Sequence, residues 1–81
     1  MTDSYYDDSE ASWKQVKDAL LRHGFEEVKK DSDDVIFFTR GPRIVRVPKE
    51  NRLYIISLLD IVQQSGIHRE DFFATLRTSG D

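Results

Sequence analysis

The pattern of apolar and polar positions is clearest in the middle of the chain, where turn residues separate two apolar runs. Val35–Thr39 is β-branched and aromatic, which favours a pleated, half-buried strand over a helix. Glycine and proline in the stretch Arg40–Arg43 then predict a tight turn. Ile44–Val47 is the predicted returning strand. It should end at Pro48, which has no N–H to donate to a neighbouring strand.

A helix and a further strand are predicted before this hairpin. Apolar residues between positions 13 and 21 recur at helical spacing, and Ser12 with Gln15 three residues later matches a capping box. Gly24 predicts the end of that helix. Phe25–Lys30 should follow as the first strand. Its imperfect alternation indicates a bulge or an edge position.

Two helices are predicted after Pro48. The first has Asn51 as its N-cap, a nearly continuous apolar run over 53–62, and a stop at Gly66. The second is short and opens at His68. The predicted order of helix, three strands, helix and short helix indicates an α+β fold with a three-stranded antiparallel sheet.

The helix over 53–62 is apolar nearly all round, which is typical of a helix buried on more than one side. A domain of 81 residues has a thin core. We therefore expect the core to take most of these side chains but not Tyr54, Ile55 and Leu59 together. This helix is the best indication in the sequence of self-association or of a protein partner.

Charge divides the chain unevenly. The net charge is −3, and residues 1–12 hold four acidic residues and no basic one. We interpret 1–12 as an acidic N-terminal arm, 13–77 as a single domain and 78–81 as a frayed end. In the arm, Tyr5 and Tyr6 are either an unpacked pair or an anchor for a partner. Positions 40–52 contain a basic cluster and only one acidic residue, Glu50. The cluster consists of Arg40, Arg43, Arg46, Lys49 and Arg52.

Composition excludes several classes of site. The chain has no cysteine, so it has neither a disulfide nor a thiolate metal site. No apolar run reaches the length of a membrane span, and a cytoplasmic location is expected. The carboxylates of Asp31, Asp33 and Asp34 lack the ligand spacing and the glycine of a calcium loop, so a solvated turn is expected there and no metal.

Residues Trp13 through Leu76 resemble the HicA toxins of bacterial toxin–antitoxin pairs, in three stretches. One is the helix end His23-Gly24-Phe25 before a strand, and another is Val45-Arg46-Val47-Pro48 followed five residues later by Leu53. The most specific is Leu58–Phe72, LLDIVQQSGIHREDF, which is similar to the family's closing pattern Leu-x-x-Ile-Leu-x-Gln-Ala-Gly-Ile-x-x-Glu-Glu-Phe. Where the family usually has Gly-Thr at the opening of a helix, this chain has Ile56-Ser57.

The resemblance implies a fold like that of double-stranded-RNA-binding domains, α-β-β-β-α with the helices on one face of the sheet, here with a short extra C-terminal helix. HicA proteins are ribonucleases that act on messenger RNA and are neutralised by an antitoxin. Their chemistry depends on a histidine in a Gly-Ser-His segment, where this chain has Asp31-Ser32-Asp33. Asp33 thus stands where the family has its histidine.

A solvated aspartate cannot supply the group titrating near neutrality that RNA cleavage needs, and neighbouring carboxylates repel the phosphodiester. His23 and His68 lie on other predicted elements. We therefore expect a degenerate HicA-like protein with no catalytic residue, no cofactor and no small-molecule substrate.

Two classes of function remain, and neither involves a membrane. The preferred one is a protein-binding regulator or inhibitor, of a phage type that covers a nucleic-acid-binding surface. Its partner is a basic protein or a second copy. Its candidate interface residues are Tyr5, Tyr6, Asp31, Asp33, Asp34, Tyr54, Ile55 and Leu59.

The alternative is an RNA-binding protein, or a residual messenger-RNA interferase neutralised by an antitoxin. Strand alternation places Arg43 and Arg46 on opposite faces of the sheet, which would divide the basic patch. An ordinary solvated surface explains the same charges. The candidate RNA-binding residues are Lys29, Lys30, Arg40, Arg43, Arg46, Lys49 and Arg52.

Overall fold

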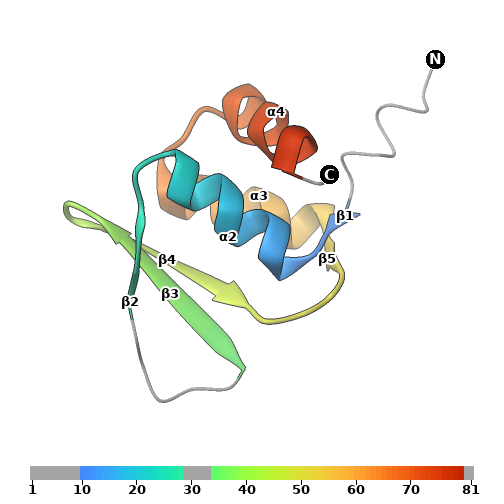
Figure 1. Cartoon of the computed structure of the whole chain (residues 1–81), viewed down its shortest axis with the longest axis horizontal. Coiled ribbons are helices and arrows are strands. Elements are labelled where there is room, and N and C mark those ends of the chain that lie inside the picture. Colours follow the sequence, from blue (N-terminus) through green and yellow to red (C-terminus); the bar gives the residue numbers. More distant parts are fainter. Residues whose placement is uncertain (1–9, 29–33, 80–81) are drawn as a thin grey trace.

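The computed structural model describes residues 10–28 and 34–79, and Figure 1 shows their arrangement. Along the chain these residues form the elements β1 (Glu10–Ala11), α2 (Trp13–Arg22), β2 (Glu26–Val28), β3 (Val35–Arg40), β4 (Arg43–Pro48), β5 (Leu53–Tyr54), α3 (Ile55–Ser65) and α4 (Arg69–Ser79). The predicted α+β fold is confirmed: a helix, a three-stranded antiparallel sheet in the order β2-β3-β4, and two C-terminal helices.

The β3–β4 hairpin forms as predicted, with Gly41 and Pro42 between the strands. In its register Phe38 faces Val45 and Ile36 faces Val47, and all four side chains are buried on the side of the sheet that faces the helices. Ile44 belongs to the opposite face and is 60% exposed. The alternation expected from the sequence therefore holds along β4.

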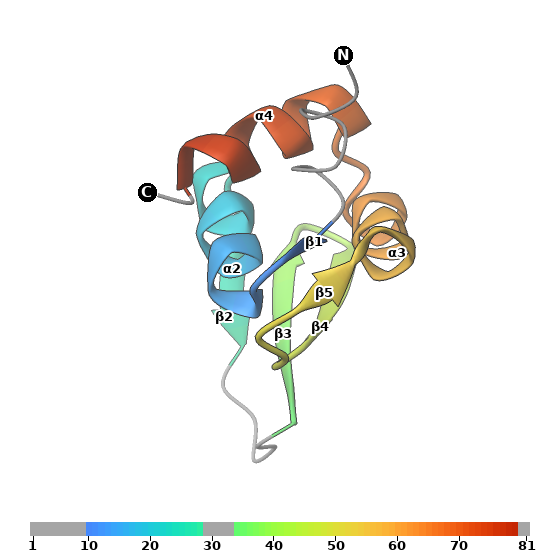
Figure 2. The ribbon, with the colours of Figure 1, turned by 90° about the vertical axis from the view of Figure 1, so that its right-hand side faces the viewer.

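All three helices lie on one side of the sheet, and α4 lies across α2 and α3 (Figures 1 and 2). The core lies between these layers. Its largest fully buried side chains are Phe38, Phe72, Leu20, Leu53, Leu58, Ile61, Val16, Val45 and Val47.

The ends of α2 follow from its sequence. Ser12 Oγ accepts the backbone N–H of Gln15 at 3.3 Å, and Gln15 Oε1 accepts that of Ser12 at 2.9 Å, so the predicted capping box is confirmed. His23 is the C-cap, and Gly24 follows with φ +89°, in the region that favours glycine.

A two-stranded ribbon of β1 and β5 was not predicted. Ala11 pairs with Leu53 and Glu10 pairs with Tyr54, and the side chain of Ala11 is buried. Tyr5 and Tyr6 lie outside the described residues. The prediction of Asn51 as the N-cap of a helix over 53–62 is wrong because Leu53 and Tyr54 are held in the ribbon (Figure 2). α3 starts at Ile55 instead, and its N-cap Tyr54 makes no side-chain capping hydrogen bond.

The last helix is longer than predicted. α4 runs for 11 residues to Ser79, so it includes Thr78 and Ser79, the first residues of the predicted frayed end. Thr78 Oγ1 donates to the carbonyl oxygen of Ala74 within this helix at 3.2 Å. The predicted stop of α3 at Gly66 is confirmed, since Gly66 is a left-handed C-cap with φ +74°.

Candidate functional site

The outward side of α3 carries exposed apolar side chains at its N-terminal end. Ile56 is 80% exposed, Tyr54, which precedes the helix, is 55% exposed, and Leu59 is 36% exposed. Ile56 and Leu59 are three residues apart and therefore lie on the same side of the helix. The residues that this helix buries are Leu58, Ile61, Val62 and Ser65. We call Tyr54, Ile56 and Leu59 the α3 surface.

Hydrogen bonds to the sheet edge fix which side of α3 faces outward. β4 is an edge strand, and the backbone N–H of Arg46 donates to Gln64 Oε1 at 2.8 Å. Gln64 Nε2 donates in turn to Asp60 Oδ2 at 2.8 Å, within the helix. Arg43 Nη1 reaches the backbone oxygen of Gln64 at 3.2 Å. These contacts occupy an edge N–H that another strand would otherwise pair with, and they hold α3 beside β4.

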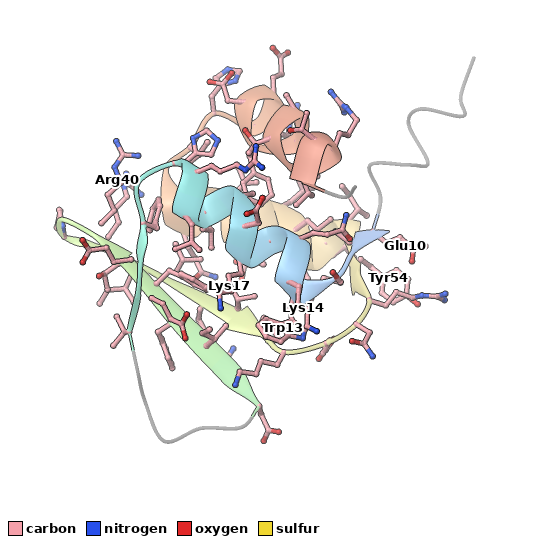
Figure 3. The ribbon with its side chains drawn as sticks, viewed as in Figure 1. Glu10, Trp13, Lys14, Lys17, Arg40 and Tyr54 are labelled. Carbon is pink, nitrogen blue, oxygen red and sulfur yellow. The ribbon has the colours of Figure 1, made fainter. Side chains whose placement is uncertain are left out.

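Tyr54 is held by its neighbours in the ribbon. Arg52 Nε lies 3.1 Å from Glu10 Oε1. A side-chain hydrogen bond with Tyr54, together with the charge of Glu10, raises the pKa of the Arg52 guanidinium above its ordinary value. This ion pair is exposed and adds little to stability. Arg52 thus interacts with both Glu10 and Tyr54, and Figure 3 shows these two residues side by side.

The structure places the other predicted interface residues apart from this surface or outside the described range. Ile55 is half-buried and packs against the core. Asp34 is exposed and immediately precedes β3, and its carbonyl oxygen accepts the N–H of Lys49. The remaining members, Tyr5, Tyr6, Asp31 and Asp33, lie outside the described residues. Ile56 was not among the predicted interface residues, although the sequence resemblance had already compared this bulky residue with a glycine of the HicA family.

The predicted basic cluster does not form one patch. Arg40 Nη1 donates to the carbonyl oxygen of His23 at 3.0 Å, and its guanidinium lies 5.8 Å from the centre of the Phe25 ring. Arg43 is bonded to α3, and Arg52 pairs with Glu10. Three of the predicted phosphate ligands are thus engaged within the fold.

The other basic residues are spread along β4. Arg46 lies on the opposite face of the sheet from Arg43, as the alternation predicted. Lys49 follows the far end of the strand, about 20 Å along the chain from Arg43 at the usual strand rise. Figure 3 shows Arg40 well separated from Tyr54 and Glu10. Lys29 and Lys30 lie outside the described residues.

A cluster that the sequence did not predict surrounds Trp13. The ammonium nitrogens of Lys14 and Lys49 lie 5.9 and 5.8 Å from the centre of its ring. Lys17, one turn further along α2, pairs with Glu27 at 3.2 Å. In the sequence, Trp13 is only one of the apolar residues that recur at helical spacing between positions 13 and 21. Only the fold brings Lys49 to it.

Both histidines have structural partners. His23 Nε2 lies 3.0 Å from Thr75 Oγ1, and the hydroxyl of Thr75 donates to the carbonyl oxygen of Asp71 at 2.9 Å. A threonine hydroxyl has one proton to donate, so His23 is the donor and carries its hydrogen on Nε2. His68 Nδ1 accepts the N–H of Glu70 at 3.3 Å. Ser32 and Asp33, which the sequence resemblance compares with the HicA catalytic segment, lie outside the described residues.

Within residues 10–28 and 34–79, no group of three or more His, Cys, Asp or Glu side chains is placed to hold a metal ion. The helices of this part of the chain are too short and too polar to cross a bilayer. Comparisons with protein-family models, with curated proteins and with solved structures found no match to this chain.

Proposed function

We propose that the chain is a non-catalytic protein-binding module that docks through the α3 surface. The observation that carries this proposal is the 80% exposure of Ile56 on a helix whose opposite side is buried in the core. Burying an isoleucine side chain contributes about 1.5–3 kcal/mol. Tyr54 supplies the amphipathic aromatic type that is enriched at protein interfaces.

The partner that fits this surface is a protein with an apolar recess bordered by basic side chains. The one charged residue of α3 is Asp60, one position after Leu59, and the net charge of the chain is −3. Basic surfaces of this kind are typical of nucleic-acid-binding proteins. By covering one, the chain would act as a regulator or inhibitor. The resemblance to HicA toxins without their histidine supports binding rather than catalysis.

The alternative functions have less support. RNA binding through the predicted arginines needs side chains that reach a phosphate together, whereas Arg40, Arg43 and Arg52 are engaged in three separate places. A residual messenger-RNA interferase needs an available imidazole. His23 Nε2 is engaged with Thr75, and His68 Nδ1 accepts a backbone N–H.

The test uses the full chain as bait, followed by purification of the captured protein and calorimetry on the two components. Ile56→Asp should weaken binding by at least about tenfold, since it places a charge in the apolar contact. Ile44→Asp is the matched control. Ile44 is also exposed, at 60%, but lies on the open face of the sheet.

Several outcomes contradict the proposal. The proposal is wrong if the bait captures no basic protein. It is also wrong if Ile56→Asp and Ile44→Asp weaken binding of the partner equally, or if Ile56→Asp binds the partner with full affinity. Sedimentation velocity on the chain alone tests whether the α3 surface binds a second copy of the chain instead. A dimer that Ile56→Asp dissociates and Ile44→Asp does not would show that the surface binds a second copy.

A further inference from the structure

We propose that the open face of the sheet β2-β3-β4, on the side away from the helices, is a dimer interface between two copies of the chain. Figures 1 and 2 show all three helices on the other side of the sheet. Side chains along a strand point to the two faces in turn, and cross-strand partners share a face. The described members of the open face are Glu26, Val28, Val35, Phe37, Thr39, Ile44, Arg46 and Pro48.

The middle of the open face is apolar. Ile44 is 60% exposed there. Val28 and Phe37 are cross-strand partners and both are half-buried. Val35 and Pro48 form a second half-buried pair. A surface that covers this face would remove these apolar side chains from water together, which favours association.

The open face carries one carboxylate and one guanidinium. Glu26 on β2 faces Thr39, which in turn faces Ile44 on β4. Arg46 lies two positions further along β4 and faces Phe37. Glu26 and Arg46 are exposed, and the ion pairs in the part of the chain that the structure describes involve neither of them. Because β2 and β4 are the two edge strands, the opposite charges lie at diagonal corners of the face.

This arrangement is complementary to itself. In a two-fold dimer, each contact between two different residues occurs twice, once in each direction. A two-fold axis in the plane of the interface, midway between Glu26 and Arg46 and at a right angle to the line joining them, places each carboxylate against the guanidinium of the second copy. The apolar residues then pack between two ion pairs. A face with one charge of each sign does not attract a polyanion or a basic protein, so a second copy fits it best.

The size of the open face limits the affinity. β3 and β4 have six residues each, so the face is about 20 Å long and about 10 Å across its three strands. Two such faces bury an area at the lower end of the range for specific interfaces. We therefore expect a reversible dimer with a dissociation constant in the micromolar range.

Sedimentation equilibrium of the full chain tests the dimer and its charge pairing. Glu26→Arg alone and Arg46→Glu alone should each raise the dimer dissociation constant by at least about tenfold, because each variant places like charges together twice in its dimer. An equimolar mixture of these two variants should dimerise with roughly native affinity, since every such contact in the mixed dimer joins opposite charges. Misfolding of a variant cannot produce this rescue.

Four further variants locate the interface. The controls Glu50→Arg and Arg69→Glu reverse the same charges at exposed residues outside the open face, and they should leave the dissociation constant within about twofold. Ile44→Asp should raise it by at least about tenfold, whereas Ile56→Asp should not change it, so the dimer and the α3 surface can fail separately. A native chain that stays monomeric at millimolar concentration would overturn the proposal. So would a mixture that stays monomeric, or a dimer that Ile56→Asp dissociates.

Discussion

Arg40 and Arg43 are cross-strand partners at the end of the β3–β4 hairpin, and each donates a hydrogen bond to the carbonyl end of a different helix. Arg40 reaches the carbonyl oxygen of His23, at the end of α2, and Arg43 reaches that of Gln64, near the end of α3. Helix C-termini have unpaired carbonyl groups and attract cations. The two arginines that the sequence suggested as RNA ligands therefore join the hairpin to the helices.

Replacing either arginine should reduce the stability of the fold. Arg40→Ala and Arg43→Ala should each lower the free energy of unfolding by about 1 kcal/mol, because each removes a charge-assisted hydrogen bond to a helix end. Urea denaturation followed by circular dichroism measures the change. Arg46→Ala is the control, since its side chain lies on the other face of the sheet, and should change stability by less than about 0.5 kcal/mol. An equal loss in all three variants would contradict the assigned role.

Gly66 should tolerate substitution less well than Gly41. Both have positive φ, which costs a non-glycine residue of order 1 kcal/mol or more. A Cβ at Gly66 would also lie 2.5 Å from Arg43 Cζ, whereas at Gly41 it meets nothing within 4 Å. Gly66→Ala should therefore destabilise the protein more than Gly41→Ala in thermal denaturation. A larger loss at Gly41 would show that the contact between Arg43 and α3 is placed wrongly.

Substitution of Asn51 tests where α3 begins, and substitution of Ser12, the N-cap of α2, shows what the loss of a true cap costs. Ser12→Ala removes half of a capping box and should cost about 1 kcal/mol in unfolding free energy. Asn51→Ala should cost less than about 0.5 kcal/mol, because Asn51 is exposed and the N-cap of α3 is Tyr54. Urea denaturation measures both. A cost at Asn51 as large as that at Ser12 would mean that α3 begins earlier than described.

The tautomer of His23 follows from its hydrogen bonds. With the Thr75 hydroxyl donating to Asp71, nitrogen-15 NMR of the imidazole should show the hydrogen of neutral His23 on Nε2. Thr75→Val keeps the side-chain shape and removes the acceptor, and in that variant the preference for Nε2–H should weaken. A neutral ring with its hydrogen on Nδ1 in the native protein would contradict the proposed link between α2 and α4.

Local chemistry was enough to predict most of the fold. The apolar run Val35–Thr39, the Gly41-Pro42 turn and the capping box at Ser12 each act within a few residues, and each is confirmed. The ribbon of β1 and β5 was missed because strands of two residues have no periodicity to detect. It depends on contacts such as that of Ala11 with Leu53, which are far apart in the chain.

The sites were harder to predict than the fold, for a related reason. Charge counting placed Arg40 and Arg43 in one patch, but whether a guanidinium meets solvent or a helix end depends on packing. The sequence shows that this helix has more apolar residues than the core can take. Which of Ile55 and Ile56 is exposed depends on where the helix begins. A start at Ile55 packs Ile55 against the core and exposes Ile56.

The α3 surface is tested most directly by mapping amide chemical shifts of the nitrogen-15-labelled chain as the captured basic partner is added. The largest changes should fall at Tyr54, Ile56 and Leu59 and continue along the exposed side of α3 to Gln63. Changes centred on Val35–Arg40 or on Trp13 and Lys14, with α3 unaffected, would contradict protein binding through this helix.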